Sequence, residues 1–284
     1  SAVAVSMLAL LLAGSAGIAG AAPQTGPVAV PVQGADRVAT AIEASKLFGT
    51  ADTVVLATGN DFPDALGGSA LAGAVGGPIL LTRGATIEAA VLAEIDRLGA
   101  TDVYILGGTG AVPAAVETAL EAADLTVTRL AGANRYATAK LVADEAIELL
   151  GDGYAGEAFL ATGLGYADAL AAAPIMYAQG MPLVLADGAG AYTLSAGMDS
   201  FYVLGGTGAV PASVDDDAEY AGRLSGASRY ETAIAVANFG VDDYGMSWND
   251  LGIATGEGFA DALAAGPLLG SKNSVLLMTQ GTVL

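Results

Sequence analysis

Three aspartates and three arginines recur at equivalent positions, and their side chains are the ones best placed to do chemistry. The aspartates, each in a block of the form ATGxxxxDAL, are Asp64, Asp168 and Asp261. The arginines, each in a block of the form GAxRxxTA, are Arg37, Arg135 and Arg229. Carboxylates serve as general acids and bases in glycoside hydrolysis, and guanidinium groups bind anions such as phosphate or an acidic glycan. These residues therefore predict a site for carboxylate chemistry or for a polar, anionic ligand.

A structural role is the alternative for both sets of residues. An aspartate in the first turn of a helix stabilises the helix dipole, so its repetition is also explained by capping, which we favour. An arginine at a helix start opposes the dipole and needs an anionic partner. We expect that partner to be a carboxylate, and most simply the DAL aspartate of the same or the next unit. The tyrosines that follow two of the arginines, Tyr136 and Tyr230, are interpreted as core residues.

The composition excludes many other kinds of site. The 284 residues include no His and no Cys, which removes imidazole bases, His and Cys metal sites, thiolate nucleophiles and disulfides. The net charge of −20 opposes binding to nucleic acid and to anionic lipid. The acidic runs at residues 215–217 and 242–243 are interpreted as solvated turns, because they lack the spacing of a calcium loop. No metal site and no cofactor are predicted.

Four sequence blocks recur in the same order and define three tandem units. Besides the two blocks above, GGPILLT returns as GMPLVLA and NSVLLMT, and YILGGTGAVP returns as YVLGGTGAVP. The glycine block fails the dinucleotide pattern and has no Walker lysine, so we interpret it as a tight turn. We place unit 1 at residues 34–130, unit 2 at 131–224 and an incomplete unit 3 at 225–284. Unit 2 replaces the helical pattern of residues 86–100 with a glycine-rich segment.

The elements that position these blocks alternate between helices and apolar strands. In unit 1 the patterns predict helices at 37–48, 63–75, 86–98 and 113–123, and strands at 53–57, 78–81, 103–106 and 125–130. The strands are apolar throughout, as in sheets that are buried on both faces. The sequence therefore predicts an α/β fold of repeated small units with mostly parallel, helix-covered sheets.

The N-terminal segment differs from the repeats. Residues 1–22 form an uncharged apolar run with an A-x-A-like site at Ala19, Gly20 and Ala21, which predicts a partial signal peptide. A membrane anchor is the alternative, and residues 23–33 are interpreted as a linker. A leader predicts secretion, with contact to the membrane only during export.

The repeated blocks resemble the cell wall-binding repeat 2 family over residues 34–284. The resemblance implies three repeats around a pseudo-threefold axis, and non-covalent attachment to anionic cell-wall polymers. It also implies a separate enzymatic or adhesive domain in many relatives. The family's anchoring motif corresponds here to the strand residues Ile79, Leu80, Leu81, Leu183, Val184, Leu185, Val275, Leu276 and Leu277.

The leading hypothesis is a non-catalytic module at the cell wall or cell surface that binds wall polymer. One alternative is a structural surface-layer protein whose repeats self-associate. Another is the anchoring part of a larger wall-modifying hydrolase whose catalytic domain lies outside these residues. A third is an enzyme that uses the repeated aspartates, which requires two carboxylates to converge in a cleft.

Overall fold

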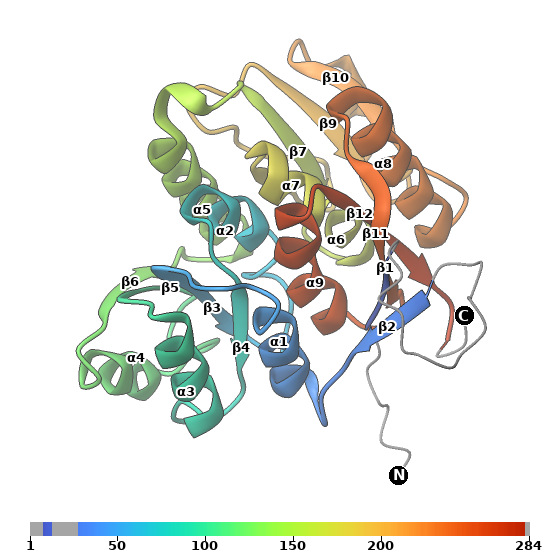
Figure 1. The fold of residues 1–284 in the computed structure, drawn as a ribbon. Helices are drawn as coiled ribbons and strands as arrows, with labels where there is room; N and C mark the ends of the chain where they lie inside the picture. The colour runs from blue at the N-terminus through green and yellow to red at the C-terminus, as the bar shows by residue number, and fades with distance from the viewer. Residues whose placement is uncertain (1–7, 13–27, 282–284) are drawn as a thin grey trace, which may run out of the picture.

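The computed structural model describes residues 8–12 and 28–281 of the chain. Three four-stranded sheets lie around a centre formed by the helices α2 (Gly68–Val75), α7 (Ala173–Gln179) and α9 (Ala260–Ser271), one from each unit (Figure 1). Units 1 and 2 each form one whole sheet, and unit 3 forms half of the third. The predicted α/β fold of repeated units is confirmed.

The sheet of unit 1 has the strand order β4-β3-β5-β6, and all of its neighbours run parallel. Its strands are β3 (Thr53–Thr58), β4 (Ile79–Thr82), β5 (Asp102–Leu106) and β6 (Thr126–Leu130). The other helices of this unit are α1 (Arg37–Ser45), α3 (Ala89–Leu98) and α4 (Ala114–Glu121). Asp36 caps α1 by accepting from the backbone N–H groups of Val38 and Ala39.

The sheet of unit 2 repeats this topology in the order β10-β9-β7-β8, again with parallel neighbours. Its strands are β7 (Glu157–Thr162), β8 (Leu183–Ala186), β9 (Ser200–Leu204) and β10 (Tyr220–Leu224). Its other helices are α5 (Arg135–Leu150), α6 (Ala167–Ala171) and the 3₁₀ helices η1 (Gly151–Gly153) and η2 (Ala212–Asp216). Residues 187–199 form a loop where unit 1 has α3, as the glycine-rich sequence predicts.

The sheet of unit 3 differs, because the N-terminal segment supplies half of it. Its order is β12-β11-β1-β2, in which β11 pairs with β12 in parallel and with β1 antiparallel. The elements are β11 (Ser247–Thr255), β12 (Ser274–Thr279), α8 (Arg229–Tyr244), β1 (Leu8–Leu12) and β2 (Val28–Val32). Strands β1 and β2 thus take the places that β5 and β6 have in unit 1 (Figure 1).

Two predictions for individual segments are wrong. Residues 28–32 of the predicted linker form the edge strand β2, because their valines favour a strand and an edge position tolerates Pro31. Helix α2 begins at Gly68 and not at Pro63, since residues 62–67 form turns that bring Asp64 toward the sheet edge. The predicted cleavage site at residues 19–21 lies outside the described residues. Cleavage there would remove β1 from the third sheet, and the leader stays a prediction.

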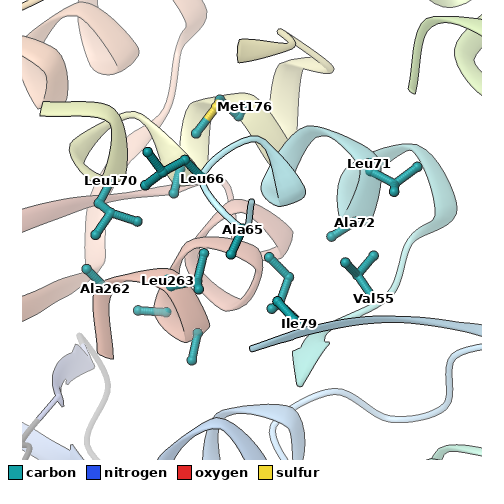
Figure 2. Close-up of a cluster of buried hydrophobic side chains, with 14 of the residues drawn as sticks. Val55, Ala65, Leu66, Leu71, Ala72, Ile79, Leu170, Met176, Ala262 and Leu263 are labelled. Atoms are coloured by element: carbon teal, nitrogen blue, oxygen red, sulfur yellow. The ribbon is translucent and has the colours of Figure 1, made fainter. Parts of the chain in front are cut away.

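The DAL blocks build the apolar centre. Figure 2 shows Ala65 and Leu66 from unit 1, Leu170 from unit 2 and Ala262 and Leu263 from unit 3 in one buried cluster. Each buried leucine contributes about 1.5–3 kcal/mol to stability. The central helices are rich in small residues, which allows their backbones to approach closely. Gly73 of α2, for example, lies directly against the backbone of Tyr177 in α7.

An aromatic ring cluster closes the arrangement around the pseudo-threefold axis. The rings of Phe62, Tyr166 and Phe259, one from each ATGxxxxDAL block, lie with centroids 5.3 to 6.2 Å apart. The guanidinium group of Arg37 lies over Phe259, that of Arg135 over Phe62 and that of Arg229 over Tyr166. The distances to the ring centroids are 5.1, 5.9 and 5.6 Å. Each arginine thus contacts the preceding unit in a closed cycle, and the expected pseudo-threefold arrangement is confirmed.

Candidate functional site

Two equivalent clefts lie at the carboxyl ends of the strands, which is where open α/β sheets bind ligands. The unit 1–2 cleft has a volume of about 420 Å³ and is lined by Thr58, Asn60, Asp61, Pro63, Asp64, Gly108, Gly110, Ala111, Gly132, Ala133, Asn134, Arg135 and Thr138. The unit 2–3 cleft has a volume of about 820 Å³. It is lined by the corresponding blocks of unit 2 and the start of α8, including Thr162, Tyr166, Asp168, Thr207, Ser228, Arg229 and Thr232.

The first glycine of each glycine block holds the cleft aspartate in place. Gly107 and Gly205 both have a φ of +96°, which side chains rarely adopt. A Cβ atom at Gly107 would lie 2.5 Å from Oδ2 of Asp64, and one at Gly205 would collide with Oδ2 of Asp168 in the same way. The glycines therefore provide the left-handed backbone and leave space for the carboxylate.

The environment of Asp168 combines burial with two stabilising partners. Burial raises the pKa of Asp168 above its usual range. A hydrogen bond from the Thr232 hydroxyl and the charge of Arg229 act in the opposite direction. Both partners come from unit 3, so the start of α8 positions a carboxylate of unit 2.

Asp261 has a different position from the other two aspartates. It lies in the first turn of α9 and is only 2% exposed, whereas Asp64 and Asp168 line clefts. The three aspartates are therefore equivalent in sequence but not in access. Their predicted position in a first helical turn holds for Asp168 and Asp261, and is wrong for Asp64, which precedes α2.

Arg135 and Arg229 do not form the expected ion pairs with Asp64 and Asp168. The Nη1 atoms of Arg37, Arg135 and Arg229 donate to the backbone carbonyls of Gly59, Gly163 and Gly256 at 2.5, 2.7 and 2.5 Å. Among the described residues, no ion pair within 4 Å joins Arg135 or Arg229 to Asp64 or Asp168. For Arg135 and Arg229, a backbone carbonyl of the same unit and an aromatic ring of the preceding unit take the place of a carboxylate, and the charge of Arg229 lowers the pKa of Asp168.

The threonine of each GAxRxxTA block was not among the predicted site residues, although its repetition is visible in the sequence. Thr40, Thr138 and Thr232 are buried. Their hydroxyls accept from the backbone N–H groups of the block's first glycine at 3.0 to 3.2 Å. The hydrogen bond fixes the loop that precedes each helix, and it orients Thr232 toward Asp168.

A second pair of arginines, Arg129 and Arg223, anchors the glycine loops. Arg129 donates to the carbonyls of Gly107 and Val112 and pairs with Glu117 at 2.8 Å. Arg223 makes the corresponding contacts to Gly205, Pro211 and Asp215. The sequence signal for both is the RL pair at the end of β6 and β10.

This geometry can be compared with known proteins. The family model for Cell wall binding domain 2 (CWB2) matches residues 32–117, 129–215 and 223–284. The chain belongs to the CWB2 family. The three matched segments correspond to the three repeats.

The chain matches only part of the length of its longer relatives. The sequence is 28% identical over 257 residues to the N-acetylmuramoyl-L-alanine amidase LytC of Bacillus subtilis, and 27% identical over 253 residues to the Amidase enhancer of the same organism. It spans 50% of the first relative and 34% of the second. Among solved structures, Cwp8 and Cwp6 from Clostridium difficile match with TM-scores of 0.74 and 0.75 and identities of 27% and 25%. The chain covers 44% and 45% of their lengths, and 87% and 95% of its own residues take part in the two matches.

The anchoring-motif residues of this CWB2 chain lie in the core. Strands β4 and β8 are buried along their whole length, and their motif residues are at most 4% exposed. In β12, Val275 and Leu276 are buried and Leu277 is half-buried. Eight of these nine side chains therefore offer almost no surface to a polymer.

The tyrosines and acidic runs also have structural roles. Tyr136 and Tyr230 pack against the core, as predicted, and lie against Gly163 and Gly256, while Arg83 takes this place in unit 1. Asp215 and Asp217 were expected to be solvated turns, but Asp215 pairs with Arg223 and Asp217 accepts from the Tyr192 hydroxyl. Residues 242–243 lie in α8 and do not form a turn.

Within residues 8–12 and 28–281, no helix combines the length and the apolar character that a membrane crossing needs. In the same part of the chain, no group of three or more acidic side chains is arranged to hold a metal ion.

Proposed function

We propose that this chain is a non-catalytic module that anchors non-covalently to an anionic glycan of the cell wall. The repeated clefts support the proposal most directly, because each brings carboxylate and hydroxyl groups, an arginine and the backbone of a glycine loop to one surface. Membership of the CWB2 family supports a cell-wall ligand. The predicted leader supports secretion to the wall or the surface.

The lining of the larger, unit 2–3 cleft favours binding over catalysis, whereas the unit 1–2 cleft carries two carboxylates, Asp61 and Asp64. Of the described residues that line the unit 2–3 cleft, Asp168 alone carries a carboxylate, whereas glycoside hydrolysis needs two that face each other. The arginine of each cleft is held by a carbonyl and an aromatic ring. A fixed cation of this kind suits recognition of a ligand.

The buried strand motifs fit this proposal through positioning. Strands β4 and β8 end at Thr82 and Ala186, whose carbonyls accept from Gly59 and Gly163 of the ATG turns. The packing of the motif residues thereby positions the ATG turns, which line the clefts. We propose that substitutions in these strands weaken anchoring by displacing the turns.

The relation to LytC favours a second, compatible proposal. Because the chain spans half of that amidase, we propose that it is the anchoring part of a larger wall-modifying protein. The net charge of −20 requires contacts with an anionic polymer to be local, bridged by cations or made in high salt.

Retention on purified cell-wall sacculi tests the proposal. We expect the protein to sediment with sacculi of Bacillus subtilis, and removal of the anionic polymers from the sacculi to abolish sedimentation. An unrelated protein of the same net charge is the control. Equal sedimentation of the control would contradict specific anchoring, and release of soluble wall fragments by the purified chain would contradict a non-catalytic role.

A further inference from the structure

Three hollows follow one another across units 1 and 2. The unit 1 hollow, of about 500 Å³, lies between the start of α1 and the end of β4 and is lined by Asp36, Asn60, Arg83 and Glu88 among others. The unit 2 hollow, of about 380 Å³, lies at the equivalent place beside α5 and β8 and includes Asn134, Tyr136, Lys140 and Tyr192. The unit 1–2 cleft is the third.

Two asparagines join these hollows into one track. Asn60 lines both the unit 1 hollow and the unit 1–2 cleft, and Asn134 lines both that cleft and the unit 2 hollow. A residue that lines two hollows lies on the boundary between them. The three spaces are therefore consecutive, with an amide side chain at each junction.

Each part of the track offers one cation beside at least one carboxylate. The cations are Arg83, Arg135 and Lys140, of which Lys140 also pairs with Asp144 at 2.8 Å, in a chain that has only 10 lysines and arginines. Arg83 is exposed, and its Nε donates to Oδ1 of Asn60 at 3.2 Å. Anionic groups that recur along a polymer would meet these cations, and sugar hydroxyls would meet the carboxylates and amides.

The two ends of the track differ because unit 2 lacks the helix α3. In unit 1, Glu88 and Ala90 at the start of α3 line the hollow. In unit 2, the loop of residues 187–199 places Tyr192 there, opposite the helix that carries Tyr136. The Tyr192 ring is held by its hydrogen bond to Asp217 and by an edge contact with Phe201 at 5.4 Å between centroids. Fixed aromatic rings favour binding of the apolar face of a sugar.

We propose that this track binds an internal stretch of a linear, anionic polysaccharide, with one sugar ring against Tyr136 and Tyr192. The inference rests on the proposed function and specifies how the ligand is held. Such a polysaccharide occupies several weak subsites of the track in series, so the affinity increases with the length of the bound fragment.

A plug in the middle of the track tests this inference. Ala133 is exposed and lines the unit 1–2 cleft, so Ala133→Trp fills the central space without disturbing the core. Ala35 is the equivalent exposed residue before α1 and lines none of the four hollows, which makes Ala35→Trp the matched control. Thermal unfolding checks that both variants fold as the wild type does.

The probe is wall polysaccharide released from Bacillus subtilis sacculi and separated by length, with binding measured by calorimetry. We expect the affinity of the wild type to increase at least tenfold from the shortest to the longest fragments. Ala133→Trp should remove this increase and Ala35→Trp should retain it. Tyr192→Ala should lower the affinity for the longest fragments several-fold.

The outcomes separate the two proposals. If the wild type binds sacculi but its affinity does not depend on fragment length, or if Ala133→Trp binds as tightly as the wild type, the track is wrong and the proposed function stands. If the wild type binds neither sacculi nor fragments, both are wrong.

Discussion

The unit 1–2 cleft and the unit 2–3 cleft are built from the same sequence blocks, yet their volumes are about 420 and 820 Å³. Their scaffolds match: in both, a buried threonine orders the loop before the helix, and an arginine donates to the carbonyl of the glycine in its own unit's ATG block. The repeated residues therefore fix the backbone of both clefts. The difference in cleft volume comes from the non-repeated residues that stand between the repeated ones.

Three smaller side chains line the larger cleft. Gly165, Ala167 and Ser228 stand where the unit 1–2 cleft has Asp61, Pro63 and Asn134. The changes also remove one carboxylate from the lining. Size and polarity thus vary independently of the scaffold, which allows one fold to present two different binding surfaces.

The largest expected effect comes from the glycines that face the cleft aspartates. We expect Gly107→Ala and Gly205→Ala each to lower the free energy of unfolding by about 2–3 kcal/mol, since a side chain is strained at positive φ and collides with the carboxylate. Urea unfolding measures the change. Gly108→Ala and Gly206→Ala are the controls, because a Cβ atom there meets nothing within 4 Å. Unequal losses at Gly107 and Gly205 would contradict the equivalence of the two scaffolds.

The arginines behind the glycine loops come next. We expect Arg223→Ala to cost about 2–3 kcal/mol, because it removes charge-assisted hydrogen bonds to Asp215 and two carbonyls in a partly buried site. Arg129→Ala should cost about 1 kcal/mol less, since Nη2 of Arg129 is buried without a hydrogen-bond partner in the structure.

Urea unfolding of both arginine variants measures this difference. Lys46→Ala, which breaks the exposed ion pair with Glu43, is the control and should change stability by under about 0.5 kcal/mol. Equal costs at Arg129 and Arg223 would show that the two loops are held equally well.

The sequence predicts much of this scaffold, because repetition marks each residue that a turn or a helix start requires. The apolar strands, the central small-residue helices and the loss of a helix in unit 2 all follow from local patterns. The partners of the arginines do not follow, since neither a backbone carbonyl of the same unit nor an aromatic ring of the preceding unit is marked by a charge pattern in the sequence. Arg129 and Arg223 also escaped prediction, because they contact glycine loops and carboxylates that only the folded sheet brings near.

Access is the other property that local patterns leave open. Asp261 matches Asp64 and Asp168 in its block, but it is buried while they line clefts. One partner of strand β1 is also non-local, because β11 lies more than two hundred residues along the chain.

A pH dependence is expected from the unit 2–3 cleft. Because the pKa of Asp168 is raised in the folded state, the unfolded chain releases this proton at lower pH. The contribution of Asp168 to stability is therefore fully present below pH 3.8 and is lost as the pH rises through the folded-state pKa. Each unit of pKa shift corresponds to about 1.4 kcal/mol.

The variant Asp168→Asn lacks this titration. We expect its stability, relative to the wild type, to increase between pH 3.5 and 6.5 in urea unfolding experiments. Asp64→Asn gives the effect of the equivalent substitution on stability in the unit 1–2 cleft. A difference between Asp168→Asn and the wild type that does not change with pH would contradict a half-buried carboxylate whose charged form is destabilised.

The smallest expected difference lies at the mouths of the two clefts. Oδ1 of Asn134 caps α5 by accepting from the N–H of Ala137 at 3.0 Å, whereas the side chain of Ser228 makes no capping hydrogen bond to α8. Asn134→Ala should therefore cost about 1 kcal/mol in urea unfolding, and Ser228→Ala only a few tenths. A similar loss from both would mean that Ser228 caps its helix in solution. In that case Asn134 and Ser228 would differ in size, but both would cap their helices.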